Sequence, residues 1–473
     1  MSRKKFLLYI FIIASSFSFS QTYEDVLRYN SFSHEGTSRF NSMGGAFGAL
    51  GGDVSAISIN PASSSVFLDS EIAISLNYKN QKINNILNSS KSKSKNDLFS
   101  FGGLGAVLVY ENKKSKLSVG YNLNILGDFN SSFRLSGNNN NGIDSYFLYY
   151  ADGIPSEDLL IYEDETTQSV YKYLGNNYGF ADQQAFLGYQ SYVINQAGED
   201  SNNYISNSSY NNLNQNLEVT RIGNHLKHSV NLGTSFNKNL FAGVNINYHE
   251  TNFEETKTFQ ENGYADDSKV ERVLLKENLL ALGNGISIQI GTIVKIKQLR
   301  LGISYTSPTE LKIEEENSQY IESDIREKDG LITYIIDPNT INIYDDYKLT
   351  LPSKSLFSLA YIFGKKGLIS FDYSRKDFSK TKFKPETDSH FSAQNMIISN
   401  TLKAANSYKI GGELRFDQLS LRGGYRFEES PYQDTTFYGD LTGYSLGLGY
   451  NFGGTTIDLA YQNSERDMNY QLY

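Results

Sequence analysis

The chain has 473 residues and a formal net charge of −9, with 39 Gly, 35 Tyr and 29 Phe but no Cys and no Trp. The absence of Cys excludes disulfides, thiolate catalysis, zinc–thiolate sites and iron–sulfur clusters. The acidic balance argues against nucleic acid as a partner, because surfaces that bind phosphate backbones are usually basic.

The N-terminus has the three regions of a secretory signal peptide. Basic residues at positions 3–5 precede an apolar run over residues 6–19, and Ser18-Phe19-Ser20 has the small-x-small pattern of a cleavage site. The run of about 14 apolar residues is too short to cross a bilayer as a helix, so a membrane anchor is not expected. We predict a cleaved signal peptide over residues 1–20. No later run reaches 18 apolar residues, which leaves an exported soluble protein or a β-barrel.

Residues 21–69 form an N-terminal extension followed by a glycine-rich stretch. In the extension, Val26, Leu27 and Tyr29 allow either a short amphipathic turn or a strand. The stretch that follows predicts close approaches of the backbone, because Gly permits positive φ and Asn-Pro starts a turn. A phosphate-binding loop is excluded, because the glycine spacing fits neither nucleotide motif and no strand precedes it. The residues of interest are Gly44, Gly45, Gly48, Asp53, Asn60, Pro61 and Ala62.

From Glu71 onward the sequence alternates with period two, which predicts β-strands with two different faces. One face carries aliphatic residues, Tyr and Phe, and the other carries Gly, Ser and Asn with scattered charges. A soluble sandwich would cover its polar face with Lys and Glu, so this pattern favours a lipid-facing side and a polar lumen. We predict an all-β fold, an antiparallel transmembrane β-barrel of about 14 strands over residues 70–473. The strands are expected at about 70–80, 97–111, 115–133, 216–237, 240–261, 269–295, 298–316, 340–364, 367–384, 404–417, 419–428, 440–453, 455–463 and 467–473.

The links between the predicted strands alternate between short and long. The long links are expected over residues 79–96, 134–215, 262–268, 317–339, 385–403 and 429–439. Short periplasmic turns and long extracellular loops are typical of outer-membrane barrels. The chain also ends on an aromatic residue, Tyr473, as do typical substrates of the barrel-assembly machinery. The sequence therefore predicts a protein of the Gram-negative outer membrane, in contact with outer-membrane lipid.

The glycine-rich stretch carries a family resemblance. Gly44 to Asp53, followed by Asn60-Pro61-Ala62 directly ahead of the first strand, resembles the N-terminal hatch of the FadL/TodX family of outer-membrane transporters. The bias toward Asn, Tyr and Lys is similar to the branch found in Bacteroidetes-type bacteria. The resemblance implies a monomeric barrel plugged by the hatch, and passive uptake of long-chain fatty acids or other hydrophobic small molecules. It leaves open a second function, because a FadL-like barrel serves the type IX secretion system as a partner of secreted proteins.

The long predicted loop over residues 134–215 contains a candidate capture site for such a molecule. Phe186, Tyr189 and Val193 are spaced at i, i+3 and i+7, which predicts one apolar helix face. With Leu159 and Leu160, this face gives a groove for an acyl chain, in which each buried methylene contributes about 0.8 kcal/mol. The alternative is that these residues only pack the loop on itself over the barrel mouth.

Gly127 and Asp128 interrupt the alternation of the third predicted strand. Gly inside a strand often marks a bulge or bend. The family's route uses a kink in the third strand that opens the wall sideways, so the resemblance implies a lateral exit at Gly127-Asp128. The alternative is an ordinary bulge near the rim.

No catalytic, metal or cofactor site is predicted. Gly443 to Gly447 matches the G-x-S-x-G esterase motif around Ser445, but that motif needs a turn between a strand and a helix, and here the alternation continues. His225 and His228 are the closest pair of histidines, and a spacing of three places them on opposite faces of a strand. The sequence therefore predicts a transporter and not an enzyme.

Overall fold

The structure is a computed structural model that describes residues 25–30, 35–88, 90–111, 116–198, 202–236 and 238–470. The predicted signal peptide and the aromatic C-terminus lie outside these residues. Over the ranges given, no helix is both long enough and apolar enough to cross a membrane.

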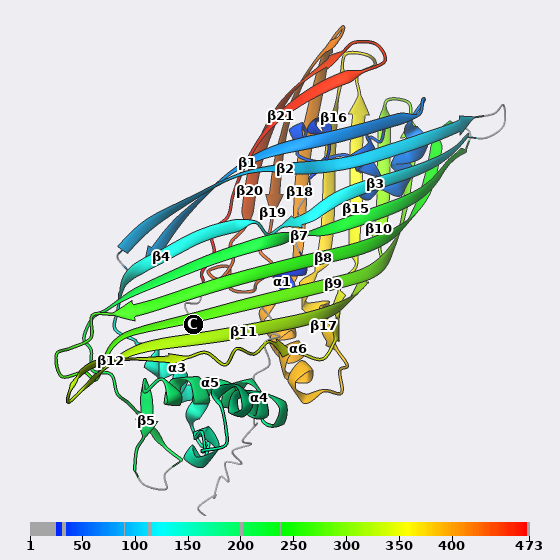
Figure 1. Cartoon of the computed structure of the whole chain (residues 1–473). Coiled ribbons are helices and arrows are strands. Elements are labelled where there is room, and N and C mark those ends of the chain that lie inside the picture. Colours follow the sequence, from blue (N-terminus) through cyan, green and yellow to red (C-terminus); the bar gives the residue numbers. More distant parts are fainter. Residues whose placement is uncertain are drawn as a thin grey trace, which may run out of the picture.

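One curved antiparallel sheet accounts for most of the chain (Figure 1). Strands make up most of the described chain, which confirms the all-β prediction. Most strands pair with strands that are close to them along the chain. The strands of this sheet are β1 (Glu71–Leu87), β2 (Ser90–Glu111), β3 (Lys116–Asp128), β4 (Ser131–Asn139), β7 (Leu213–Phe236), β8 (Leu240–Asn262), β9 (Val270–Ile296), β10 (Leu299–Thr306), β11 (Thr309–Glu327), β12 (Gly330–Ile336), β13 (Asn342–Ile343), β14 (Tyr347–Leu351), β15 (Lys354–Ile362), β16 (Gly367–Asp377), β17 (Lys382–Lys384), β18 (Ala404–Phe416), β19 (Leu419–Glu428), β20 (Leu441–Asn451) and β21 (Thr456–Glu465).

The sheet ends at β1 on one side and at β21 on the other. β1 pairs with β2, and β21 pairs with β20. In the part of the chain that the structure describes, no pairing joins β1 to β21.

Several predicted strands are broken into segments that stay in line with one another. β10 and β11 both pair with β9, and the break between them contains Pro308; Pro352 lies between β14 and β15. Proline has no N–H to donate to the ladder, so each of these breaks has a local cause. β3 and β4 both pair with β7 but are separated at Phe129 and Asn130 without a proline.

Three parts of the predicted strand pattern are wrong. No loop spans residues 79–96, because β1 and β2 remain paired as far as Leu87 and Ser90. The polar residues there still alternate, but the prediction followed apolar residues and therefore ended both strands too early. In the same way, β11 and β12 pair within the expected loop over 317–339. The expected strand over 467–473 does not form over residues 467–470, where Met468 makes only an isolated bridge to Tyr438.

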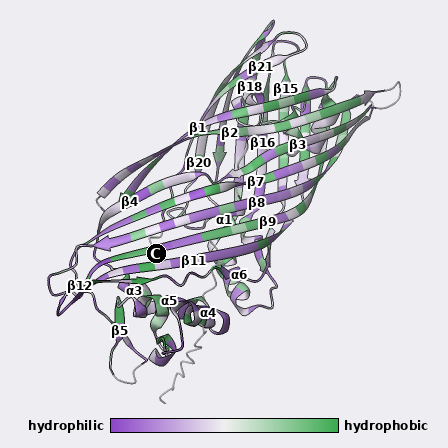
Figure 2. Cartoon of the chain, in the orientation of Figure 1, coloured by the Kyte–Doolittle hydropathy of each residue, from purple (hydrophilic) through white to green (hydrophobic). Residues whose placement is uncertain are grey.

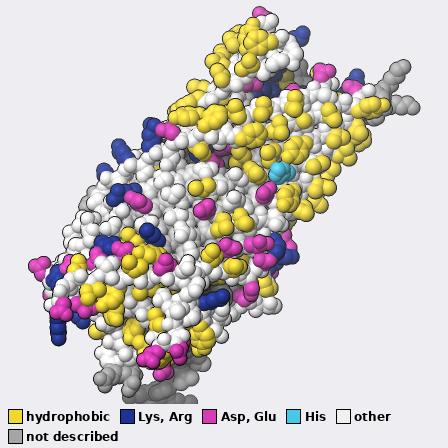
Figure 3. Space-filling view, in the orientation of Figure 1, with side chains coloured by type: hydrophobic (Ala, Val, Ile, Leu, Met, Phe, Trp, Pro, Cys, Tyr) yellow, Lys and Arg dark blue, Asp and Glu magenta, His cyan; other side chains and the backbone are white. Residues whose placement is uncertain are grey.

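The two faces of the sheet differ as the alternation predicts. Near the short turns, the outer face exposes aliphatic and aromatic side chains, as Ile286, Ile288 and Ile290 of β9 do. Figures 2 and 3 show this hydrophobic band on one half of the strands and a more polar outer surface toward the long loops. The inner positions hold many buried Ser, Asn and Gln side chains, among them Asn231, Asn245 and Gln289. An apolar outside around a polar inside is the reverse of a soluble protein and suits a lipid environment.

Residues 35–67, called the inner segment from here on, lie inside the curved sheet. Thr37, Asp53 and Asn60 each cap a short helix by accepting a hydrogen bond from a backbone N–H group of its first turn. Phe40 and Phe47 form a small buried core with Leu356 of β15. The helices of the inner segment are α2 (Ser38–Ser42), η1 (Val54–Ser58) and η2 (Pro61–Val66).

The backbone of the inner segment lies directly against the strands, at positions where the strands carry glycine. A Cβ atom on Gly424 of β19 would overlap main-chain atoms of Gly44 and Met43, and one on Gly243 of β8 would overlap those of Pro61. Other sheet glycines meet side chains of the inner segment, as Gly105 of β2 does with Val54 and Gly447 of β20 with Ser42. Contacts with the inner segment therefore run from β2 to β20, and the sheet curves around it. The sheet glycines whose Cβ would meet this segment are Gly105, Gly120, Gly233, Gly243, Gly291, Gly302, Gly411, Gly424 and Gly447.

Helices cover the loop end of the sheet, at the bottom of Figure 1. The loop domain, residues 140–212, packs its apolar core on β4, β7, β8, β9 and β11. Val26 and Tyr29 of the N-terminal extension are buried with Ile398 among residues of β11, β14 and β17. The helices and small strands at this end are α1 (Asp25–Tyr29), α3 (Asp144–Ala151), η3 (Ser156–Leu159), α4 (Thr167–Asn177), α5 (Phe180–Gln190), β5 (Ile194–Gln196), β6 (Tyr204–Ser206), η4 (Phe378–Lys380) and α6 (Ser389–Thr401).

We expect Gly424→Val to displace the inner segment, because the added side chain overlaps backbone and not a flexible side chain. Gly423→Val is the matched control. Gly423 lies on the same strand, and the nearest atom to its added Cβ, the carbonyl oxygen of Ser445, would be 3.8 Å away. The measurements are the temperature at which the folded form is lost in gel electrophoresis and the sensitivity of cells to a bulky antibiotic. Equal behaviour of the two variants would show that the inner segment does not depend on this contact.

Candidate functional site

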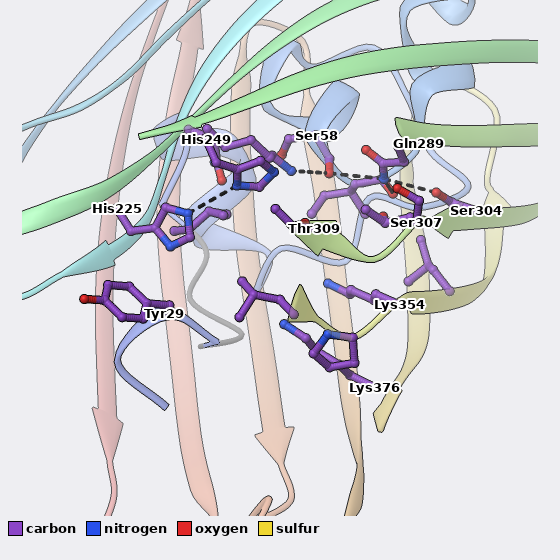
Figure 4. A pocket seen from close by; sticks show the side chains of 18 residues that line it. Tyr29, Ser58, His225, His249, Gln289, Ser304, Ser307, Thr309, Lys354 and Lys376 are labelled. Atoms are coloured by element: carbon purple, nitrogen blue, oxygen red, sulfur yellow. Dashed lines mark hydrogen bonds between the residues drawn. The ribbon is translucent and has the colours of Figure 1, made fainter. Parts of the chain in front are cut away.

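A cavity lies between α1 and the inner segment, near the middle of the molecule (Figure 4). Its lining includes Lys227 of β7, Lys354 of β15 and Lys376 of β16, and we call it the lysine cavity. Its apolar lining comes from Ile59, Leu126, Leu351, Pro352 and Leu356. Its polar lining comes from Tyr29, Ser58, Asn124, His225, Lys227, His249, Gln289, Ser304, Thr306, Ser307, Thr309, Lys354 and Lys376.

Lysines, the acid–base residues whose charge is opposite in sign to that of a carboxylate, line the lysine cavity. Three of its lining side chains are lysines, and no Asp or Glu is among the described residues that line it. Lys227 donates to the carbonyl oxygen of Ser58 at 3.1 Å, and the Lys376 ammonium lies 5.4 Å from the centre of the Phe378 ring. An anionic group that entered this space would therefore meet several cations and no competing carboxylate in the lining.

Two histidines line the same cavity beside the lysines. His225 Nε2 lies 3.2 Å from His249 Nδ1 (Figure 4). His249 Nε2 lies 3.0 Å from the hydroxyl of Ser287. His228 points to the other face of the sheet, where its Nδ1 lies 2.9 Å from the hydroxyl of Tyr121. The expectation that His225 and His228 do not share a face is confirmed. In the residues that the structure describes, no group of three His, Asp or Glu is placed to hold a metal ion.

A buried network of charges holds the inner segment to the last strands. Arg39 of α2 pairs with Glu413 of β18 at 3.0 Å. Glu413 also pairs with Arg422 of β19 at 2.7 Å, and Arg422 pairs with Asp458 of β21 at 2.5 Å. Because Glu413 is 1 % exposed and joins two arginines, it is the central anion of this network.

The residues predicted for the hatch all lie in the inner segment. Gly44 and Gly45 have φ values of 62° and 74°, which favour glycine. The Gly48 N–H donates to the carboxylate of Asp372 on β16 at 3.0 Å, and the amide of Asn60 donates to the Gly48 carbonyl at 2.7 Å. Asp53 accepts a hydrogen bond from the hydroxyl of Thr37 at 2.7 Å. The last two, Pro61 and Ala62, are buried in the first turn of η2 against β7 and β8.

The residues predicted for the loop groove lie in the core of the loop domain. Leu159, Phe186 and Val193 are fully buried and Tyr189 packs against them, whereas Leu160 is 39 % exposed. The predicted helix face is wrong at its end, because α5 stops at Gln190 and Val193 follows a turn. None of the five lines the lysine cavity.

The loop domain is anchored to the sheet by hydrogen bonds as well as by apolar packing. The Tyr171 hydroxyl donates to Gln319 of β11 at 2.8 Å. Burial raises the pKa of Tyr171, which keeps this hydroxyl protonated and able to donate.

Gly127 and Asp128 lie at the end of β3, where the wall of the sheet is interrupted. The pairing between β2 and β3 ends at Leu104 and Leu123, and the register against β7 shifts between Ile125 and Gly127. Lys79 of β1 pairs with Asp128 across this gap at 2.8 Å. Asn124 and Leu126, just before the break, line the lysine cavity, so the cavity and the interruption are adjacent.

The three cavity lysines and His249 were not predicted from the sequence. Each lysine stands at an inner position of its strand, in the same alternation as the Ser and Asn residues around it. The alternation could have placed each lysine inside the sheet. Their meeting depends on which strands face one another, and no local pattern in the sequence contains that information.

An apolar outer band, an enclosed inner segment and a polar interior define a membrane protein built from strands. A family model described as "Outer membrane protein transport protein (OMPP1/FadL/TodX)" matches residues 181–468. The match covers more than half of the chain, and the chain belongs to this family. It is therefore an outer-membrane transport protein and not an enzyme. The matched region does not include the glycine-rich stretch that carried the resemblance.

Solved structures similar to this chain include three channels and transporters. The CymD monoaromatic hydrocarbon channel is 13% identical, with 91% of this chain and 93% of that chain covered and a TM-score of 0.44. A Pseudomonas aeruginosa FadL homologue is 11% identical, with 93% and 91% covered and a TM-score of 0.47. The Ralstonia pickettii toluene transporter TbuX is 13% identical, with 92% and 93% covered and a TM-score of 0.44. A comparison with curated proteins finds no match.

We expect Glu413→Ala to loosen the inner segment, because it leaves the buried guanidinium groups of Arg39 and Arg422 without their shared carboxylate. Breaking such a buried pair typically costs about 3–5 kcal/mol. The control is Arg415→Ala, because Arg415 contacts the same carboxylate but its side chain is 41% exposed, and such a loss costs at most about 1 kcal/mol. Urea unfolding of the detergent-solubilised protein measures the loss of stability in both variants. Similar midpoints for the two variants would contradict the central role of Glu413.

Proposed function

We propose that this protein takes up hydrophobic small molecules that carry an anionic group, with long-chain fatty acids as the leading candidates. The observation that carries the proposal is the lysine cavity, whose lining combines three lysines with apolar side chains and contains no carboxylate. A carboxylate gains charge-assisted hydrogen bonds there, and the start of an acyl chain meets Leu126, Leu351 and Leu356. The family assignment supports a transport role at the outer membrane.

The size of the lysine cavity indicates that this conformation is closed. Its volume of about 90 Å³ is well below the roughly 300–1,000 Å³ typical of sites for drug-sized ligands. It can hold the head group of a fatty acid but not the whole chain. Passage therefore requires a movement of α1 or of the inner segment, driven by the substrate's own binding and concentration gradient.

We propose that the inner segment is the hatch of a closed barrel of about 14 strands in the membrane. Unpaired strand edges are costly in hydrocarbon, so β1 and β21 are expected to approach one another and close the sheet. Two observations support closure. The amide of Gln462 on β21 donates to the Asn41 carbonyl at 2.8 Å, and the amide of Asn77 on β1 donates to the Glu35 carboxylate at 3.0 Å. Both edge strands of the sheet thus contact the same inner segment.

We also propose a route through the protein. The groove around Leu159, Leu160, Phe186, Tyr189 and Val193 captures the acyl chain once the core of the loop domain opens. The head group then reaches the lysine cavity, and the substrate leaves into the membrane at Gly127 and Asp128. The interruption between β2 and β3 beside the cavity supports this last step.

We expect Lys376→Gln to raise the substrate concentration needed for half-maximal uptake of labelled oleate by about tenfold, since one hydrogen bond to a charged group contributes about 1.5–3 kcal/mol. Uptake of oleyl alcohol, which has the same chain without the charge, should change little. Lys365→Gln is the matched control, because Lys365 is exposed in the turn after β15. An equal loss for the acid and the alcohol would contradict recognition of a carboxylate.

The same strains test the transport function as a whole. A deletion strain should lose oleate uptake and regain it with the wild-type gene. Its surface and secreted proteins are compared in parallel. Unchanged uptake with lost surface proteins would overturn the proposal in favour of a protein-secretion role.

We expect a covalent link between residues 79 and 128 to block release of the substrate. The chain has no Cys, so Lys79→Cys with Asp128→Cys introduces the only two thiols for a short bifunctional crosslinker. Oleate uptake should fall to the level of the deletion strain after crosslinking. The control pair is Thr220→Cys with Thr256→Cys, which face one another in the continuous ladder of β7 and β8. Full uptake after crosslinking residues 79 and 128 would exclude this exit.

A further inference from the structure

The hairpin of β1 and β2 carries a row of lysines on its outer face. The two strands pair in the order Tyr78 with Phe99, Asn80 with Asp97, Lys82 with Lys95, Asn84 with Lys93 and Ile86 with Lys91. All of these side chains are exposed. The alternation of Lys and Ser over residues 90–95 places every lysine outside and every serine inside, so the four charges share one surface. Figure 3 shows Lys and Arg side chains gathered at this end of the two strands.

The lysine row begins directly beyond the hydrophobic band. The hydrophobic band on this face ends with the exposed side chains of Leu76, Tyr78, Phe99 and Phe101. Aromatic residues mark the membrane interface in outer-membrane barrels. Lys95 lies four residues beyond Phe99, which is about 13 Å along a strand and about 9 Å in height for a strand tilted by about 45°. The head-group layer is about 5–8 Å thick on each side of the hydrocarbon. Lysine side chains extend toward such interfaces, so Lys82 and Lys95 reach the head groups.

The charges of the row are not balanced within the hairpin. Asp97 is the single acidic residue of this outer face, and it is already bonded to Lys95, Asn80 and Tyr78. Lys82 and Lys95 stand directly opposite one another, and like charges in that position are destabilising. On the outer faces of the other strands toward the loop end, exposed cations lie beside carboxylates, as Arg134 does with Glu218, Lys312 with Glu314 and Lys348 with Glu310. The unbalanced row of lysines is therefore a feature of the hairpin of β1 and β2.

We propose that this face, formed by Lys82, Lys91, Lys93 and Lys95, binds the phosphate groups of anionic lipid in the leaflet on the loop side. The lipid is the occupant that fits, because Lys82 and Lys95 present ammonium groups at head-group height and Lys93 and Lys91 continue the positive row outward from them. The site is separate from the lysine cavity, and it does not depend on which molecule the protein transports. Lysines also protect exposed strand edges from aggregation, and that role requires no phosphate.

The test measures binding of the full-length, detergent-solubilised protein to purified lipid A, and to the same lipid A after enzymatic removal of its phosphates. The wild type should bind the phosphorylated lipid far more tightly. A variant with Gln at positions 82, 91, 93 and 95 should bind it about 25-fold more weakly or worse, since each of the two cations at head-group height contributes roughly fivefold. A variant with Arg at the same four positions should keep the affinity.

The matched control changes Lys238, Lys297, Lys365 and Lys366 to Gln, which removes the same charge from exposed turns at the other end of the strands. Its affinity should stay within about threefold of the wild type. An equal loss of affinity in both Gln variants would show that net charge alone causes the effect, and it would overturn the proposal. Equal binding of the phosphorylated and dephosphorylated lipids would also overturn it, as would displacement of lipid A by an equimolar amount of inorganic phosphate. Electrophoretic mobility before and after heating confirms that each variant is folded.

Discussion

The close approach of the inner segment to the sheet is the constraint on which the rest of the structure depends. Two backbones can touch without side chains between them only where one of them carries glycine, and Gly243, Gly302, Gly411 and Gly424 occupy such positions. Five further sheet glycines make room for side chains of the inner segment. The abundance of Gly in the chain has a structural cause in this arrangement. Because no apolar layer separates the backbones, the remaining inner positions must satisfy the polar groups of the inner segment, and Asn231, Asn245 and Gln289 do so.

The polar interior is divided into two parts that differ in charge balance. Around Arg39, Glu413 and Arg422, cations and anions alternate, so the charges hold the inner segment to the last strands. In the lysine cavity the lining contains cations alone. A balanced network stabilises one arrangement of the chain, whereas lysines in a lining without carboxylates suit the anionic ligand proposed above. The division therefore separates the part that holds the inner segment in place from the part suited to binding.

The sequence was sufficient to predict the class of fold but not the site. Period-two alternation reveals strands because each side chain faces the opposite way from its neighbours, and this holds for most of the sheet. The prediction failed where the outer residues are polar, as at Lys91 and Lys93, because it relied on apolar residues to recognise a strand. It missed the lysine cavity for a different reason. Lys227 and Lys376 are brought together by the curvature of the whole sheet, and curvature is not a local property of the sequence.

The charge of the loop domain limits how the proposed substrate can enter. Between residues 140 and 212, Lys172 is the only cation, whereas acidic residues recur throughout the segment. A carboxylate approaching this domain is repelled, so its charge cannot be what draws it in. The first contact must then rest on the acyl chain, whose burial is favourable whatever the charge of the surroundings. In the proposed route, the lysines attract the head group only after it has passed the loop domain. Capture by the chain and retention by the head group are separate steps on this route, and a molecule lacking either part is expected to complete only one of them.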